Sequence, residues 1–237
     1  MTSLTIETVQ VETGANPTGT VIWLHGLGAD GHDFEPVVAE LRVSTDPPLR
    51  FVFPHAPVRP VTLNGGMPMR AWFDLYGLDR QARQDDVGIA ESDSTVRKLI
   101  RRENERGLPS ARIVLAGFSQ GGAQALYSGT RYREGLAGIM GLSCYLPVAS
   151  RLAEERSHAN QQTPVFMAHG SFDTVVDPAL GEESRAVLTA AGQPVEWHTY
   201  PMAHAVCPEE IAAIAGWLRK VLPESCTIRR GQRFQCR

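Results

Sequence analysis

The 237-residue sequence has little cysteine, and its cysteines follow no recognisable spacing. The four residues, Cys144, Cys207, Cys226 and Cys236, include no Cys-x-x-Cys pair and no zinc-finger pattern. Neither a disulfide framework nor a structural zinc site is therefore expected to hold the fold, and we expect four reduced thiols. The alternative is a bridge between Cys226 and Cys236, which lie in the same C-terminal tail.

The chain also has a small net charge and no long apolar run. The formal net charge is −3, and no stripe of clustered Lys and Arg marks a nucleic-acid surface. No apolar run is long enough to span a bilayer, and the first residues lack the pattern of a signal peptide. We therefore expect no nucleic-acid partner, no membrane span and a cytoplasmic location.

Metal and cofactor signatures are missing as well. No His-Glu-x-x-His occurs, the seven histidines are scattered, and no Walker sequence indicates a nucleotide. The sequence therefore predicts chemistry without metal or cofactor, performed by side chains alone.

What the sequence does contain is an alternation of apolar runs and amphipathic stretches. Runs typical of buried strands are 20–24, 51–53, 112–118, 136–142, 164–168 and 195–200, and helical spacing covers 34–41, 87–105, 121–133, 178–191 and 209–222. This alternation predicts an α/β fold with a mostly parallel sheet and helices on both faces. We expect one domain over residues 1–222 and an Arg-rich C-terminal extension over 223–237.

The strongest chemical signal is the sequence Gly-Phe-Ser-Gln-Gly at 117–121, between an expected strand and an expected helix. It fits Gly-x-Ser-x-Gly, in which a sharp turn raises the serine hydroxyl above the carboxyl edge of the sheet. Small residues two positions before and after the serine avoid collision in that turn. The pattern indicates an α/β-hydrolase with Ser119 as nucleophile; the alternative is a glycine-rich turn of structural use only.

A serine nucleophile needs a base and a group that orients the base, in the chain order Ser, acid, His. His204 lies in a loop after the last expected strand, whereas His198 lies within that strand. Asp173 follows the strand that ends near residue 168 and is our candidate acid. Asp177 is the competitor, but its place directly before Pro178 is typical of a helix N-cap.

The negative oxygen that forms during acyl transfer needs two preorganised backbone donors. One is the N–H of Gln120, the residue after the nucleophile. The second is expected from the loop His-Gly-Leu-Gly at 25–28, with the N–H of Leu27 as donor; the alternative is an ordinary glycine turn.

Four separated motifs together resemble one known group. They are His-Gly-Leu-Gly-Ala-Asp at 25–30, Gly-Phe-Ser-Gln-Gly-Gly at 117–122, His-Gly-Ser-Phe-Asp at 169–173 and the loop of His204, with Ala-Trp-Phe-Asp at 71–74 in addition. The set is similar to the acyl-protein thioesterase / lysophospholipase-like carboxylesterase family, and the segment 61–66 is nearest to its bacterial carboxylesterase branch. The resemblance covers about residues 5–222.

The resemblance implies a single α/β-hydrolase domain without a large cap, and the triad Ser119, Asp173 and His204. It implies oxyanion donors at Leu27 and Gln120, hydrolysis of short- to medium-chain carboxylic esters and sometimes of acyl thioesters or lysophospholipids, and frequent homodimers. Two features depart from the family: Cys144 stands where a glycine is usual, and the tail after Leu222 has no counterpart.

An irregular stretch from Val58 to Arg83 is rich in Met and aromatic residues, and its loop from Leu63 to Tyr76 is expected to line an acyl groove. Our candidate substrate-binding residues are Leu63, Met69, Trp72 and Phe73; the alternative is that they pack this loop onto the sheet.

The sequence thus predicts a serine carboxylesterase for short- to medium-chain esters. The alternatives are acyl-protein thioesterase or lysophospholipase activity, a peptidase or acyltransferase, and a non-catalytic binding protein of the same fold. A cysteine nucleophile is not expected, because neither Cys144 nor Cys207 lies in a nucleophile turn.

Overall fold

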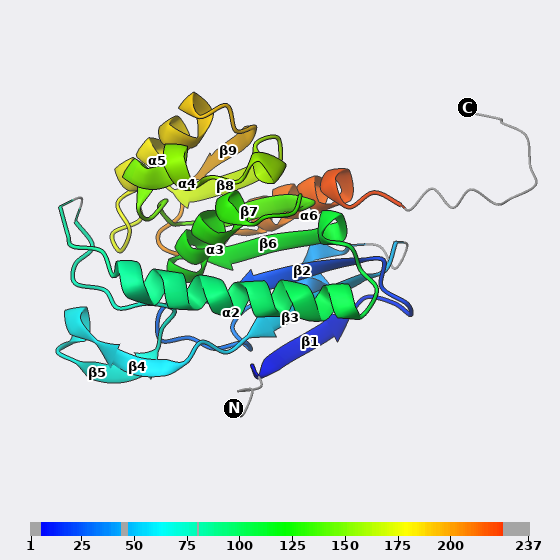
Figure 1. Cartoon of the computed structure of the whole chain (residues 1–237), viewed down its shortest axis with the longest axis horizontal. Helices are drawn as coiled ribbons and strands as arrows, with labels where there is room; N and C mark the ends of the chain where they lie inside the picture. Colours follow the sequence, from blue (N-terminus) through cyan, green and yellow to red (C-terminus); the bar gives the residue numbers. More distant parts are fainter. Residues whose placement is uncertain (1–5, 44–46, 80, 225–237) are drawn as a thin grey trace, which may run out of the picture.

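A seven-stranded sheet forms the centre of the molecule in the computed structural model, which describes residues 6–43, 47–79 and 81–224 (Figure 1). The strand order is β1-β3-β2-β6-β7-β8-β9. Only β1 runs antiparallel to its neighbour, and every other pairing is parallel. The strands are β1 (Thr8–Glu12), β2 (Gly19–Leu24), β3 (Leu49–Pro54), β6 (Ile113–Phe118), β7 (Gly138–Leu142), β8 (Val165–Gly170) and β9 (Val195–Tyr200).

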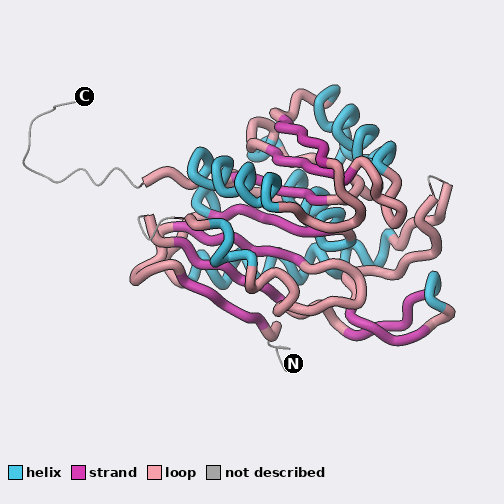
Figure 2. Tube along the Cα trace, turned by 180° about the vertical axis from the view of Figure 1, so that it is seen from behind, coloured by secondary structure: helices cyan, strands magenta, loops and turns pink. Residues whose placement is uncertain are grey.

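Helices cover both faces of this sheet (Figure 2). One apolar cluster joins the sheet to α2 (Asp86–Glu105), α3 (Gln120–Arg131), α4 (Leu152–Glu155) and α5 (Pro178–Ala190). A second cluster on the other face joins it to α1 (Val37–Leu41) and α6 (Pro208–Val221). The sheet is therefore the middle of three layers.

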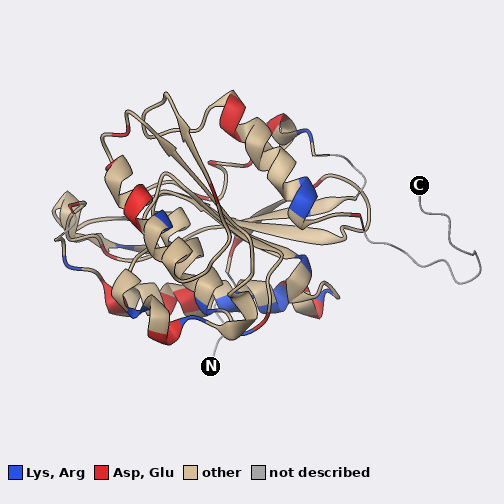
Figure 3. Ribbon diagram, turned by 90° about the horizontal axis from the view of Figure 1, so that it is seen from above, with Lys and Arg blue, Asp and Glu red and all other residues tan. Residues whose placement is uncertain are grey.

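The central strands are apolar throughout because both of their faces are buried. In β2, Ile22 and Leu24 face the first cluster, whereas Val21 and Trp23 face the second. The interior strands carry almost no charged residues, and most acidic and basic residues lie on the outer helices and loops (Figure 3). This arrangement confirms the predicted α/β-hydrolase architecture.

Five elements differ from the sequence prediction, among them the short helix α4, which was not expected. Strand β1 was not expected, and the stretch 58–83 contains the hairpin β4 (Val58–Val61) and β5 (Met67–Arg70), joined through a short 3-10 turn at Thr62–Asn64. Helix α1 begins only at Val37, after Pro36, and is shorter than expected. The tail beyond Glu224, with Cys226 and Cys236, lies outside the described residues.

The loops at the carboxyl ends of the parallel strands carry the candidate site. Ser119 follows β6, Asp173 follows β8 and His204 follows β9, while Leu27 follows β2 beside β6. Within the described part of the chain, no helix is long and apolar enough to cross a membrane.

Candidate active site

Ser119 occupies a strained turn between β6 and α3. Its backbone angles are φ 53° and ψ −122°, which a residue with a side chain rarely adopts. A Cβ atom on Gly117 would lie 2.2 Å from the carbonyl oxygen of Gly121, and one on Gly121 would lie 2.3 Å from that of Leu24. Only glycine therefore fits on either side of this serine, which is the steric requirement that the motif indicates.

The imidazole of His204 and the carboxylate of Asp173 form a short hydrogen bond. Nδ1 of His204 lies 2.7 Å from Oδ2 of Asp173, and because a carboxylate only accepts, Nδ1 is the donor. This tautomer leaves Nε2 free to accept a proton. The ring centroid of His204 lies 4.8 Å from that of Phe118, so the imidazole stands beside the residue directly before Ser119.

Asp173 is held from several sides although it is almost completely buried. Its Oδ1 accepts hydrogen bonds of 2.9 Å from the backbone N–H groups of Val175 and Val176. Nε2 of His169 lies 3.3 Å from Oδ2, the oxygen that also binds His204. These contacts fix the direction in which the carboxylate points.

The competing residues lie in other places. Asp177 accepts from Ala179 N at 2.9 Å and caps α5, as its position before Pro178 indicates. His198 pairs with Glu196 on strand β9 and stacks on Phe166. The structure thus brings together Asp173 and His204, and not Asp177 or His198.

The loop after β2 packs directly against the turn of Ser119. A Cβ on Gly26 would lie 3.5 Å from Cβ of Ser119, and one on Gly121 would lie 2.5 Å from the carbonyl oxygen of His25. Leu27 and Gln120, the two expected oxyanion donors, therefore belong to backbone segments in close contact.

The glycines of this loop, at positions 26, 28 and 31, also match the Gly-x-Gly-x-x-Gly spacing of dinucleotide sites. That function needs a helix N-terminus at the end of the loop, whereas α1 begins only at Val37. The glycines instead permit close backbone contacts: a Cβ on Gly31 would lie 2.5 Å from the carbonyl oxygen of Phe53.

A cavity of about 210 Å³ with a mainly apolar wall lies on the far side of Phe73, and its lining includes neither the triad residues nor the two expected oxyanion donors. Phe73 is one of its lining residues, and the carbonyl of Phe73 accepts a hydrogen bond of 2.7 Å from the side chain of Gln120. The apolar lining residues are Phe73, Leu75, Leu78, Ile89, Leu146, Ala149, Leu180 and Val187, with Tyr145 beside them.

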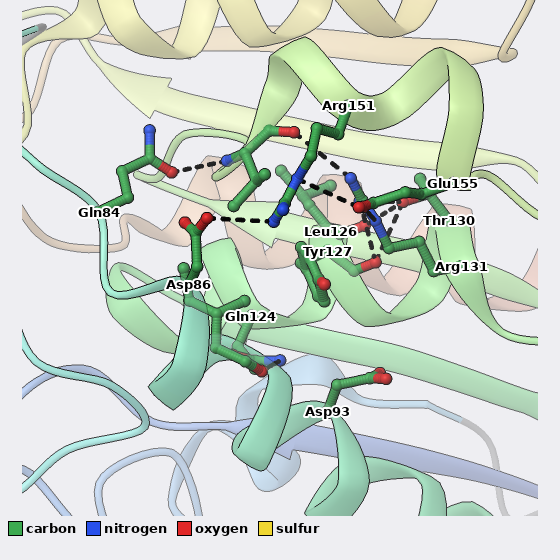
Figure 4. Close-up of polar contacts among 12 residues, drawn as sticks. Gln84, Asp86, Asp93, Gln124, Leu126, Tyr127, Thr130, Arg131, Arg151 and Glu155 are labelled. Carbon is green, nitrogen blue, oxygen red and sulfur yellow. Dashed lines mark hydrogen bonds and ion pairs between the residues drawn. The ribbon is translucent and has the colours of Figure 1, made fainter.

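Polar contacts hold the loop that forms one wall of this cavity (Figure 4). Oε1 of Gln84 accepts from the N–H of Val148 at 2.6 Å, and Arg151 lies 3.3 Å from Asp86 at the start of α2. The carbonyl of Val148 accepts from Arg131 of α3, which also pairs with Glu155. The wall is thereby attached to the helix that begins at the nucleophile.

The four predicted substrate-binding residues occupy different environments. Phe73 lines the cavity, and Met69 is half-buried near Gly28. Leu63 lies on the hairpin turn and is 40% exposed, away from the cavity lining. Trp72 has no exposed surface, and its indole N–H donates to the carbonyl of His25, so it lines no groove.

Most of the residues that line the cavity were not predicted from the sequence. Tyr145, Leu146, Leu180 and Val187 come from two segments far from the aromatic loop. Each is an ordinary apolar residue in its own segment, and only the position of each segment after a neighbouring strand could have suggested a role.

The described cysteines have no features of a nucleophile. Cys144 is buried, and burial raises its pKa far above the ordinary value. Its Sγ lies where side chains on Gly122 or Gly141 would clash, so it fills space behind the nucleophile helix. Burial also raises the pKa of Cys207. Among the described residues, no cluster of His, Cys, Asp or Glu has the arrangement of a metal site.

A strand-turn-helix nucleophile position, a His–Asp pair on later loops and a three-layer α/β sheet define a serine hydrolase of the α/β-hydrolase fold. Comparison with known families agrees: residues 6–222 match the Phospholipase/Carboxylesterase family, and the chain belongs to it.

Similar proteins carry related names. Acyl-protein thioesterase 1 of Neurospora crassa is 41% identical over 219 residues, covering 89% of each chain. Acyl-protein thioesterase 1 of Mycosarcoma maydis is 40% identical, covering 91% of this chain and 96% of the relative. The crystal structure of acyl-protein thioesterase 2 of Zea mays superposes with a TM-score of 0.81 at 31% identity, over 91% of this chain and 99% of that one.

Proposed function

We propose that this hydrolase cleaves acyl thioesters of proteins, and carboxylic esters by the same route, through an acyl-enzyme on Ser119. The observation that carries the proposal is the 2.7 Å bond between His204 and Asp173, beside the strained turn that holds the serine. The names of relatives near 40% identity favour a thioester as the main substrate over the short-chain ester suggested by the sequence alone.

In the first half of the reaction, Oγ of Ser119 attacks the acyl carbonyl carbon. Nε2 of His204 takes the hydroxyl proton, and the ionised Asp173 stabilises the imidazolium that results. The carbonyl oxygen becomes negative and accepts from the N–H groups of Leu27 and Gln120. The positive end of α3 also favours charge at this point.

This first half ends when the tetrahedral intermediate collapses and expels the leaving group, which takes the proton from Nε2 of His204 and departs as a thiol or an alcohol. A thiolate leaves readily because its conjugate acid has a pKa of roughly 8.5, so it needs less help from His204 than an alkoxide does. In the second half, water attacks the acyl carbon and gives a proton to His204; the new tetrahedral intermediate then breaks its bond to Oγ of Ser119, which takes that proton back as the carboxylic acid is released.

The cavity at Phe73 suits the acyl chain. It is lined mainly by apolar side chains, and its lining residue Phe73 accepts a hydrogen bond from the side chain of Gln120, whose N–H is the expected oxyanion donor. Burying each methylene of the chain contributes about 0.8 kcal/mol to binding, so acyl length should appear in KM.

The test is a parallel assay with the purified chain. An S-octanoyl cysteine peptide, p-nitrophenyl octanoate and a lysophospholipid are compared, with Ser119→Ala as control. We expect the highest kcat/KM for the thioester and loss of all activity in Ser119→Ala. Activity of Ser119→Ala equal to that of the wild type would overturn the proposal. A higher kcat/KM for the oxygen ester would instead support the carboxylesterase prediction.

The cytoplasmic location and the homodimer remain predictions that rest on the sequence and its resemblance. Light scattering of the purified chain at several concentrations tests the dimer directly.

A further inference from the structure

One backbone segment, residues 70–73, contacts both parts of the expected oxyanion hole. We propose that Trp72 is a positioning residue: its indole N–H and its backbone amide hold the Leu27 loop and the Gln120 turn in a fixed relation. The inference rests on the proposed function, because it assigns a role in stabilising the acyl-transfer transition state.

The loop that carries Leu27 is held on both sides of that residue. On one side, the N–H of Gly28 donates to the carbonyl of Arg70 at 2.9 Å. On the other side, Nε1 of Trp72 donates to the carbonyl of His25, also at 2.9 Å. Segment 70–73 thus fixes the two residues adjoining Gly26–Leu27, which limits rotation of the intervening peptide groups.

The same segment is attached to the nucleophile turn. The N–H of Trp72 donates to Oε1 of Gln120 at 2.9 Å, and Nε2 of Gln120 donates to the carbonyl of Phe73 at 2.7 Å. The carboxamide of Gln120 therefore pairs with the backbone as another strand would. Its own N–H, directly after Ser119, is the second oxyanion donor.

These groups are buried and fully paired, which makes the arrangement rigid. Trp72 has no exposed surface, and its carbonyl accepts from the hydroxyl of Ser92. The ring of His25 accepts from Ala56 N at 3.0 Å and lies 2.7 Å from the carbonyl of Gly26. Burial lowers the pKa of His25, so its neutral ring has one donor and one acceptor, as this network requires.

A positioning role makes a distinct kinetic prediction. Oxyanion donors stabilise the substrate oxygen mainly when it is negative. A small displacement of Leu27 therefore raises the free energy of the transition state more than that of the bound substrate. Loss of the Trp72 hydrogen bond should therefore lower kcat and leave KM nearly constant, whereas loss of a substrate contact should raise KM.

The chain offers a matched control in Trp23. This residue is also buried, in the strand that precedes the same loop, but its indole N–H has no hydrogen-bond partner among the described residues. Trp23→Phe and Trp72→Phe remove the same atoms from the interior, and only Trp72→Phe removes a bond to the oxyanion loop.

The experiment compares the two variants with the wild type on p-nitrophenyl acetate. It also measures inhibition by a trifluoromethyl ketone, which accepts Oγ of Ser119 at its carbonyl carbon and places a negative oxygen in the hole as the hydroxyl proton moves to His204. We expect Trp72→Phe to lower kcat about tenfold and to weaken the ketone by the same factor. Trp23→Phe should change each by less than about twofold.

Equal effects of the two variants, or a change of Trp72→Phe confined to KM, would overturn the inference while the proposed function stands. If Trp72→Phe does not fold, Gln120→Met gives the same test, because it keeps the backbone donor and removes the carboxamide bonds to segment 70–73. Gln120→Met with the kcat and ketone affinity of the wild type would then overturn it. A wild type inactive on every ester and thioester would remove both proposals.

Discussion

Asp173 and Asp177 lie four residues apart, and mutation can test the separate roles that we propose for them. Asp173→Asn keeps the shape of the side chain but offers His204 the wrong hydrogen-bonding group. We predict a fall in kcat of roughly 10³–10⁴-fold, measured with a thioester at saturation. Asp177→Asn should retain kcat, because asparagine caps a helix about as well as aspartate. Equal losses in both variants would contradict this assignment of the acid.

Glu210 gives a residue-level prediction about pH. It is completely buried in the first turn of α6, and burial raises its pKa to about 8 from the ordinary 4.5. Between these two values the folded protein binds a proton that the unfolded chain has released, so stability falls as the pH rises through this interval. Above pH 8 the ionised, buried Glu210 lowers the free energy of unfolding by up to about 5 kcal/mol, at roughly 1.4 kcal/mol for each unit by which its pKa is raised.

Glu210→Gln removes this titration and keeps a neutral side chain of the same size. We expect urea unfolding to show a more stable variant above pH 8 and nearly equal stabilities near pH 4.5. The exposed neighbour Glu209 provides the control, since Glu209→Gln should show no such dependence. A Glu210→Gln variant that loses stability at every pH would refute the explanation.

Individual candidate site residues can be proposed from the sequence where a motif indicates a role. Ser119, Asp173 and His204 follow from spacing and chain order, and their loops meet at one edge of the sheet. The role of Trp72 could not be predicted, because apolar composition is the same for a groove wall and for a buried hydrogen-bond donor. Only the contact of its indole with His25 distinguishes them.

At the scale of elements, the glycines around Ser119 determine whether the turn can form. Gly121→Ala should reduce both stability and kcat, because the added Cβ would lie 2.3 Å from the carbonyl of Leu24 and would separate β2 from α3. Gly216→Ala is the control: it lies inside α6 with open space around it and should stabilise by about 0.5–1 kcal/mol. Thermal unfolding and p-nitrophenyl ester turnover measure both effects, and an active, stable Gly121→Ala would contradict the steric argument.

The elements that the sequence did not predict lack a strong hydrophobic pattern. Strand β1 is an edge strand with polar residues between its half-buried ones. The hairpin β4–β5 carries prolines at 60 and 68, which normally argue against a strand. They are tolerated because this sheet has only two strands. The interior strands were predicted because burial on both faces leaves an unbroken apolar run.

At the scale of the whole molecule, a buried charge cluster, which stabilises the fold, and the candidate catalytic groups lie at opposite ends of the strands. At the amino end of the strands, buried Glu103 of α2 binds Arg50 and Arg106 at 2.8 Å and Thr20 at 2.9 Å. The candidate catalytic groups lie at the opposite, carboxyl end.

Removal of this buried carboxylate should therefore affect folding without changing the chemistry. We predict that Glu103→Ala lowers the free energy of unfolding by about 1–3 kcal/mol, since the hydroxyl of buried Thr20 loses its acceptor and Arg50, which keeps its pair with Glu12, loses one of its two carboxylate partners. Its kcat should remain that of the wild type at a temperature where it is folded. Glu91→Ala removes an exposed pair and should cost less than about 1 kcal/mol. A large loss of kcat in folded Glu103→Ala would show that the two ends are coupled.

The most direct test of the account is covalent labelling with a fluorophosphonate, followed by mass-spectrometric mapping of the adduct. The account predicts a single phosphonylated residue, Ser119, with activity lost in proportion to labelling and no adduct in folded Ser119→Ala. An adduct at another residue, or undiminished turnover after complete labelling of Ser119, would contradict it.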